Sequence, residues 1–190
     1  MIKRNIIFFL LNLTLSYTIV AQSYNRLFKK TVLENSDTTI ISLPQAAQGK
    51  PFIIILSTPE CPISQKYTPI LRVMNNQYSS IKFYQIFTKW DDWASIQEFK
   101  KEYSLSIPAL KDKAGQLVKN IKARVTPEVF FFNKNYVLLY RGAIDNWFFN
   151  LGKHRQEATE CYLEDAIIAY LKGEKIKIKK TNAVGCIIEK

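Results

Sequence analysis

The sequence predicts an α/β protein in which helices flank a mixed central β-sheet, and three observations support this prediction. The apolar run 52–56, whose three central residues are β-branched, is continuous, which is typical of a central parallel strand buried on both faces. Two apolar runs, 128–132 and 136–140, are separated by a short polar loop and predict an antiparallel hairpin. A last helix over 157–171 stops at Gly173, a residue suited to a helix C-terminus.

Helical and extended patterns alternate between the buried strand and the hairpin. Apolar residues at helical spacing, such as Trp93, Ile96 and Phe99, predict helices there. In chain order, the remaining expected elements are a strand at 38–43, a helix from 62 to 78, a strand at 81–87, a helix at 93–103, an extended piece at 107–110 and a short helix at 114–121.

The N-terminus has the pattern of a secretory signal peptide. Lys3 and Arg4 precede an apolar stretch at 6–15, and Ala21 is a plausible cleavage position. A retained membrane anchor is the alternative, but the apolar stretch is shorter than the roughly 20 residues that a spanning helix needs. We therefore expect a periplasmic or secreted protein with no stable membrane insertion after cleavage. The expected organisation is a signal peptide at 1–21, a polar leader at 22–36, one domain at 37–173 and a C-terminal tail at 174–190.

Composition and charge narrow the function classes. With 47% hydrophobic and 23% charged residues, the chain has the balance of one globular domain. The formal net charge of +11 could favour nucleic acid or an anionic membrane surface. The export signal and the lack of a nucleic-acid-binding motif favour a solvated basic surface instead. We expect no nucleic-acid partner.

Three cysteines, Cys61, Cys161 and Cys186, remain after cleavage. An odd number in an oxidising compartment leaves at least one thiol without an intramolecular partner. The spacing of the cysteines does not match a zinc site, and His154 is the only histidine. We therefore expect no metal and no cofactor.

Cys61 is the candidate nucleophile. It follows the buried strand and precedes Pro62, which suits the first turn of a helix. Backbone N–H groups at a helix start stabilise a thiolate, so the pKa of Cys61 should lie below that of free cysteine. The alternative is a buried, inert cysteine that fills space.

Three short stretches resemble a known family: Cys61-Pro62-Ile63-Ser64, Thr126-Pro127-Glu128 before the hairpin, and Tyr140-Arg141-Gly142 at its end. In these stretches the chain is similar to the redoxin branch of the thioredoxin superfamily, of the peroxiredoxin-like or AhpC-TSA type. The resemblance spans roughly residues 38–172 and implies a thioredoxin-like fold.

The resemblance also implies roles for residues near Cys61. Where dithiol redoxins have a second cysteine this chain has Ser64, so Cys61 needs either mono-thiol chemistry or a resolving cysteine elsewhere. Pro127 is expected to be cis and to lie beside Cys61, with Thr126 before it, at a substrate-binding edge. A trans proline in a loop is the alternative.

Two further residues bear on peroxide chemistry. Thr58 occupies the position of the peroxiredoxin threonine, although Ile54 replaces the proline of that pattern. Arg124 could supply the arginine that peroxiredoxins bring close to the thiolate, or it could be a surface residue.

The expected function is that of an extracytoplasmic thiol oxidoreductase with possible antioxidant activity. Its substrates would be protein thiols and disulfides or a peroxide, and an unidentified reductant would regenerate Cys61. The alternative is a non-catalytic binding module that docks a periplasmic partner.

The tail offers a resolving cysteine. The alternating residues 176–178 resemble an edge strand and lead to Gly185 and Cys186 in a segment that can move at little cost. We expect a Cys61–Cys186 disulfide in the oxidised protein. A structural Cys161–Cys186 bridge and a free Cys186 are the alternatives.

Overall fold

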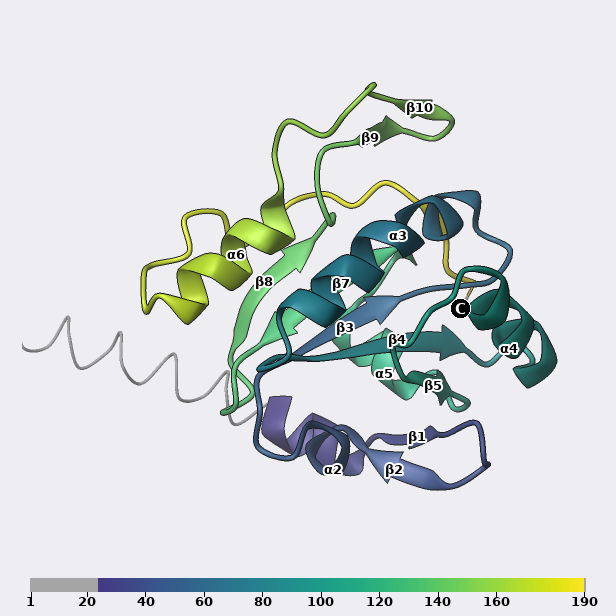
Figure 1. Cartoon of the computed structure of the whole chain (residues 1–190). Coiled ribbons are helices and arrows are strands. Elements are labelled where there is room, and N and C mark those ends of the chain that lie inside the picture. The colour runs from purple at the N-terminus through teal and green to yellow at the C-terminus, as the bar shows by residue number, and fades with distance from the viewer. Residues whose placement is uncertain (1–23, 190) are drawn as a thin grey trace, which may run out of the picture.

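The structure, a computed structural model, describes residues 24–189 (Figure 1). The expected signal peptide at 1–21 lies outside the described residues. Within the described part of the chain, no helix is long and apolar enough to cross a membrane.

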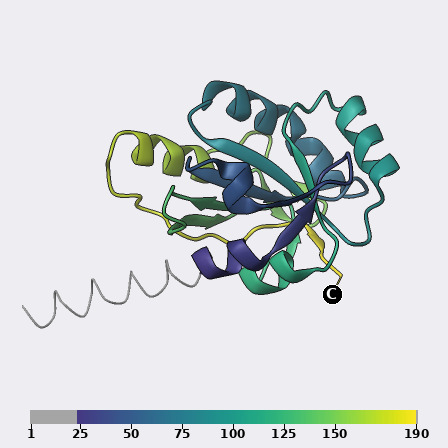
Figure 2. The ribbon, with the colours of Figure 1, turned by 90° about the horizontal axis from the view of Figure 1, so that it is seen from below.

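A seven-stranded mixed sheet forms the centre of the molecule (Figures 1 and 2). Its three inner strands are parallel, and antiparallel strands flank them on both sides. The expected hairpin is present as the last two strands of this order. Across the sheet, the order is β2 (Ile40–Ser42), β1 (Val32–Glu34), β5 (Ala109–Asp112), β4 (Lys82–Thr88), β3 (Phe52–Leu56), β7 (Glu128–Phe132) and β8 (Leu138–Gly142). The predicted fold class is therefore confirmed.

Strand β3 is buried on both faces, as its continuous apolar run predicts. Ile53 and Ile55 pack with α3 (Pro62–Gln77) and α6 (Tyr162–Leu171) on one face. Phe52, Ile54 and Leu56 pack on the other face with α2 (Leu43–Ala47) and α5 (Gln116–Ile121). Helix α4 (Trp93–Glu102) packs through Ile96 and Phe99 against Phe87 of β4. Because side chains alternate along a strand, one run supplies two core layers.

Two regions before the tail differ from the sequence-based expectation. Within the expected polar leader, residues 24–30 are helical and β1 joins the central sheet. The last helix begins at Tyr162 rather than 157, and the hairpin β9 (Phe148–Asn150) and β10 (Lys153–His154) precedes it. Asn146 accounts for the late start, because its side-chain oxygen accepts hydrogen bonds from the N–H groups of residues 159 and 160 and satisfies them outside the helix.

The tail also differs from the expectation. Residues 176–178 do not form a strand. The chain instead makes a bridge between Lys180 and Arg141 and then forms strand β11 (Cys186–Ile187), which pairs antiparallel with β6 (Val125–Thr126). Regular pairing thus occurs nearer the C-terminus than the alternating residues suggest.

Candidate functional site

Cys61 lies where β3 gives way to α3, at the N-cap position of the helix. Its Sγ accepts a hydrogen bond from the backbone N–H of Ser64 at 3.4 Å. In the thiol form, Sγ donates to the carbonyl oxygen of Thr126 at 3.0 Å. The residue is only 1% exposed. Pro62 occupies the first helical turn, where a missing N–H costs no hydrogen bond.

The surroundings of Cys61 favour its ionised form. Burial raises the pKa of the Cys61 thiol, but hydrogen bonds from the thiol and N–H of Cys186 and from the N–H of Ser64 outweigh it, so the pKa is lowered. Burial, the hydrogen bond to Cys61 and the charge of Cys61 together raise the pKa of Cys186 to about 12. Of the two thiols, Cys61 therefore loses its proton more readily than Cys186.

The bond between Thr126 and Pro127 is cis, as expected. Thr126 is opposite Cys186 in the register of β6 and β11, and the next hydrogen bond runs from the N–H of Ile188 to the carbonyl of Arg124. Residues opposite one another in an antiparallel pair have Cα atoms about 5 Å apart. The tail thus carries Cys186 to the loop that contacts Cys61.

One pocket, of about 340 Å³, brings most of the expected site residues together. Cys61, Thr58, Thr126 and Cys186 all line it. It lies at the carboxyl ends of the parallel strands β3 and β4, the edge where α/β proteins commonly place their sites. Its other lining residues are Pro59, Glu60, Thr88, Trp90, Asp91, Asp92, Ser95, Ile187, Ile188 and Glu189.

Thr58 and Arg124, the two residues expected to act on a peroxide, have other contacts. The Thr58 hydroxyl donates to Oδ1 of Asp91 at 2.5 Å. Asp91 also accepts from the N–H and hydroxyl of Thr88. The Arg124 side chain is exposed, and Arg124 lines a different hollow beside α5 rather than the Cys61 pocket.

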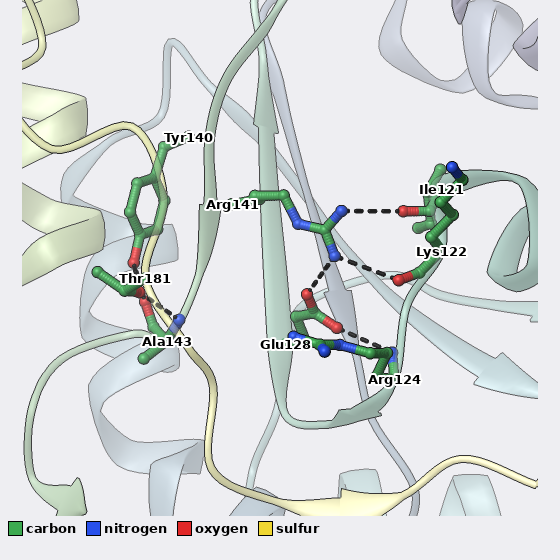
Figure 3. A network of polar contacts seen from close by, with 8 residues as sticks. All are labelled: Ile121, Lys122, Arg124, Glu128, Tyr140, Arg141, Ala143 and Thr181. Atoms are coloured by element: carbon green, nitrogen blue, oxygen red, sulfur yellow. Dashed lines mark hydrogen bonds and ion pairs between the residues drawn. The ribbon is translucent and has the colours of Figure 1, made fainter.

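A buried ion pair holds the chain before β6 in place (Figure 3). Arg141 on β8 contacts Glu128 on β7 at 2.6 Å and also donates to the carbonyls of Ile121 and Lys122. The other carboxylate oxygen of Glu128 accepts from the N–H of Arg124. Two of the three resembling stretches therefore meet in one network, which positions residues 121–126 next to the cysteine.

The functional surroundings that sequence reasoning missed are Asp91 and the tail strand. Asp91 follows the end of β4, whose neighbour β3 leads to Cys61. Adjacent parallel strands end at the same edge, so this position was a usable signal. No comparable signal pairs Cys186 with Thr126, because 60 residues separate them.

The remaining thiol lies apart from the pocket. Cys161 is exposed at the N-cap of α6, and burial, followed by the charges of Glu164, Asp145 and Asp165, raises its pKa. All three cysteines are free thiols here. Within residues 24–189, no group of three or more His, Cys, Asp or Glu side chains is placed to hold a metal ion.

Comparison with known proteins identifies the family. Residues 25–141 match the AhpC/TSA family, which is more than half of the chain, so this protein belongs to that family. No curated protein matches the sequence.

Solved structures show the same fold. A hypothetical protein from Sinorhizobium meliloti 1021 is similar with a TM-score of 0.72 and 21% identity, over 83% of this chain and 88% of that one. An uncharacterised conserved protein from Geobacillus kaustophilus has a TM-score of 0.72 and 20% identity, over 84% and 87%. A secreted disulfide oxidoreductase from Mycobacterium tuberculosis, homologous to E. coli DsbE, has a TM-score of 0.52 and 23% identity, over 60% and 82%. The fold is thioredoxin-like.

Proposed function

We propose that this protein is a thiol-disulfide oxidoreductase in which Cys61 is the nucleophile and Cys186 the resolving thiol. The observation that carries the proposal is that both cysteines line one pocket, where Thr126 accepts a hydrogen bond from Sγ of Cys61 and pairs in register with Cys186. Their pKa values are shifted in opposite directions, which gives each a distinct role.

The reaction takes two electrons from the two protein thiols. The Cys61 thiolate attacks one sulfur of a substrate disulfide, forms a mixed disulfide and releases the other half as a thiolate. Cys186 then loses its proton to solvent and attacks Sγ of Cys61, which expels the second half of the substrate. The products are two substrate thiols and a Cys61–Cys186 disulfide. An external dithiol reductant reduces this disulfide and is itself oxidised.

The surroundings of the two cysteines assist these steps. Formation of the mixed disulfide removes the charge of Cys61, which is one of the causes that raise the pKa of Cys186. Cys186 thus becomes easier to ionise when it is needed as the attacking thiol. Thr126 lines the pocket and its carbonyl contacts Sγ of Cys61, so the substrate sulfur would lie beside it, whereas Pro127 is not among the residues that line the pocket.

Disulfide exchange is favoured over peroxide reduction. The Thr58 hydroxyl is engaged by Asp91, and the Arg124 side chain is outside the pocket. A peroxide would therefore meet the thiolate without these two groups to orient and polarise it. The secreted disulfide oxidoreductase of M. tuberculosis, which is similar in fold, supports disulfide chemistry and a place outside the cytoplasm.

The test compares wild type with Cys61→Ser and Cys186→Ser. Reduction of a disulfide under turnover with an external dithiol should fall at least about a thousandfold in Cys61→Ser, because thiolate chemistry is lost. Cys186→Ser should accumulate the mixed disulfide at Cys61, visible by mass spectrometry. Hydrogen peroxide should oxidise Cys61 more slowly than the disulfide does.

Cys161→Ser is the matched control and should keep wild-type turnover, since Cys161 lies outside the pocket. Equal activity of Cys61→Ser and wild type would refute the proposal. That result would favour a non-catalytic binding module instead.

A further inference from the structure

Strand β11 occupies a backbone edge that would otherwise be open beside the nucleophile. Strand β6 pairs with β11 in a two-stranded sheet of its own, and the paired residue Thr126 also contacts Sγ of Cys61. Open edges of this kind bind extended peptides by adding them as a further strand. In this protein the tail takes that place, so an extended polypeptide and the tail compete for the same hydrogen bonds.

Contacts on both sides of strand β11 hold the tail in place. At its start, the hydroxyl oxygen of Thr181 accepts from the N–H of Ala143 at 2.9 Å and shares a 2.6 Å hydrogen bond with Tyr140 (Figure 3). At its end, Ile188 is only 8% exposed and packs in the core on the α5 side of the sheet. Displacing the strand therefore costs both hydrogen bonds and apolar burial.

The tail approaches the proline loop so closely at Gly185 that no side chain fits between them. A Cβ at Gly185 would lie 2.1 Å from the carbonyl oxygen of Thr126 and 2.6 Å from its carbon, closer than real Cβ atoms come. Only glycine fits at this position while β11 stays paired. The segment therefore covers the loop without a gap for a second chain.

What remains open to Cys61 is the pocket of about 340 Å³ between the tail and the start of α4. This volume suits a small molecule rather than a folded chain. Of the described residues that line it, four are acidic, Glu60, Asp91, Asp92 and Glu189, and none is basic. Carboxylates around a pocket favour a cation and disfavour an anion, although the rest of this chain is strongly basic.

We propose that the tail strand closes the peptide-binding edge, so that Cys61 acts on low-molecular-weight disulfides, cationic before anionic, rather than on protein disulfides. This inference rests on the proposed function and names the substrate class of the same site. The tail then has two roles. Cys186 resolves the mixed disulfide, and the backbone around it selects substrates by size.

The experiment measures the first step alone, formation of the mixed disulfide at Cys61, by mass spectrometry after mixing the reduced protein with one disulfide. The disulfides are cystamine (a dication), hydroxyethyl disulfide (neutral), dithiodiglycolate (a dianion) and insulin as the protein disulfide. Two variants lack Cys186 equally: Cys186→Ser keeps the tail strand, and a chain ending at Thr181 lacks it. The ratio of the insulin rate to the hydroxyethyl disulfide rate cancels any change in thiolate fraction between them.

With the tail present, insulin should react at least about a hundredfold more slowly than hydroxyethyl disulfide, and cystamine about tenfold faster than dithiodiglycolate. Removing the tail should raise the ratio of the insulin rate to the hydroxyethyl disulfide rate at least about tenfold. Added to Cys186→Ser, Gly185→Ala should also raise this ratio, because its Cβ forces the strand away from Thr126. Asn182→Ala, at an exposed tail residue, should leave the ratio as it is in Cys186→Ser alone.

Three results separate the possible failures. An unchanged insulin ratio after truncation would overturn the size selection. Equal rates for the dication and the dianion would overturn the charge selection. Loss of reactivity towards every disulfide in a folded wild-type protein would instead refute the proposed function.

Discussion

Cys61 and Cys186 line the same pocket, yet the chain places them by different means. Cys61 is positioned locally, by a buried strand that leads directly to a helix whose Ser64 N–H contacts its sulfur. Cys186 is positioned over a long range, by a two-residue strand that pairs with Thr126. The pKa is lowered at the first cysteine and raised at the second. The comparison teaches that a nucleophile can be built into one short segment, whereas its partner here depends on the packing of the whole tail.

The largest expected effect comes from placing the resolving cysteine in the same short segment as Cys61. Ser64 lies at the third position of the helix, is buried, and its hydroxyl has no hydrogen-bond partner among the described residues. A cysteine there would adjoin Cys61 and could close a disulfide without the tail. We expect Ser64→Cys to restore turnover to Cys186→Ser by at least about a hundredfold.

Peptide mapping of the oxidised double variant checks the route, and a bond between Cys61 and the new cysteine is expected. Ser64→Ala in the same background is the control and should restore nothing. If Ser64→Cys also failed to restore turnover, the resolving step would not be the function lost in Cys186→Ser.

The second prediction concerns a variant that loosens the loop on which the tail strand pairs but leaves the segment that carries Cys61 unchanged. Glu128→Ala leaves Arg141 without its buried carboxylate partner and removes the acceptor for the N–H of Arg124. Breaking a buried ion pair in this way should cost about 3 kcal/mol of unfolding free energy, measured by urea denaturation. The loosened loop carries β6, so alkylation of Cys186 should accelerate more than that of Cys61.

Lys113→Ala is the matched control, because Lys113 makes an ion pair with Glu34 while its side chain is 74% exposed. Its unfolding midpoint should stay close to that of wild type. Equal destabilisation by both variants would show that the Glu128 pair does not organise the site.

The local half of the site is the half that the sequence predicts well. The apolar run of β3, followed by Cys61 and Pro62, fixes a strand and a helix start, and both are present. The alternation of core layers along β3 follows from the same run. The resemblance adds the cis bond before Pro127, which the structure confirms.

The long-range half could not be read in the same way. The tail segment has no periodicity that selects β6 as its partner, and residues 176–178 suggested a strand that does not form. Pairing there depends on the glycine at 185 and on the hydroxyl of Thr181, which act only once the loop and β8 are in place. The role expected for Arg124 depended on its sequence position near Pro127. That position does not determine where its side chain points, and the side chain is exposed outside the Cys61 pocket.

The last prediction changes neither fold nor substrate and concerns only the titration of Cys186. Burial raises its pKa, and the hydrogen bond to Cys61 and the charge of Cys61 raise it further, to about 12. Cys61→Ser removes the charge, so the negative field that opposes proton loss disappears and the pKa of Cys186 should fall below about 12. Burial remains, so the value should stay above that of free cysteine, about 8.5. The measurement is the pH dependence of Cys186 alkylation, followed by mass spectrometry, in a Cys161→Ser background with and without Cys61. The midpoint should lie at lower pH without Cys61. An unchanged midpoint would mean that burial alone sets the titration of Cys186 and that the two thiols are not coupled.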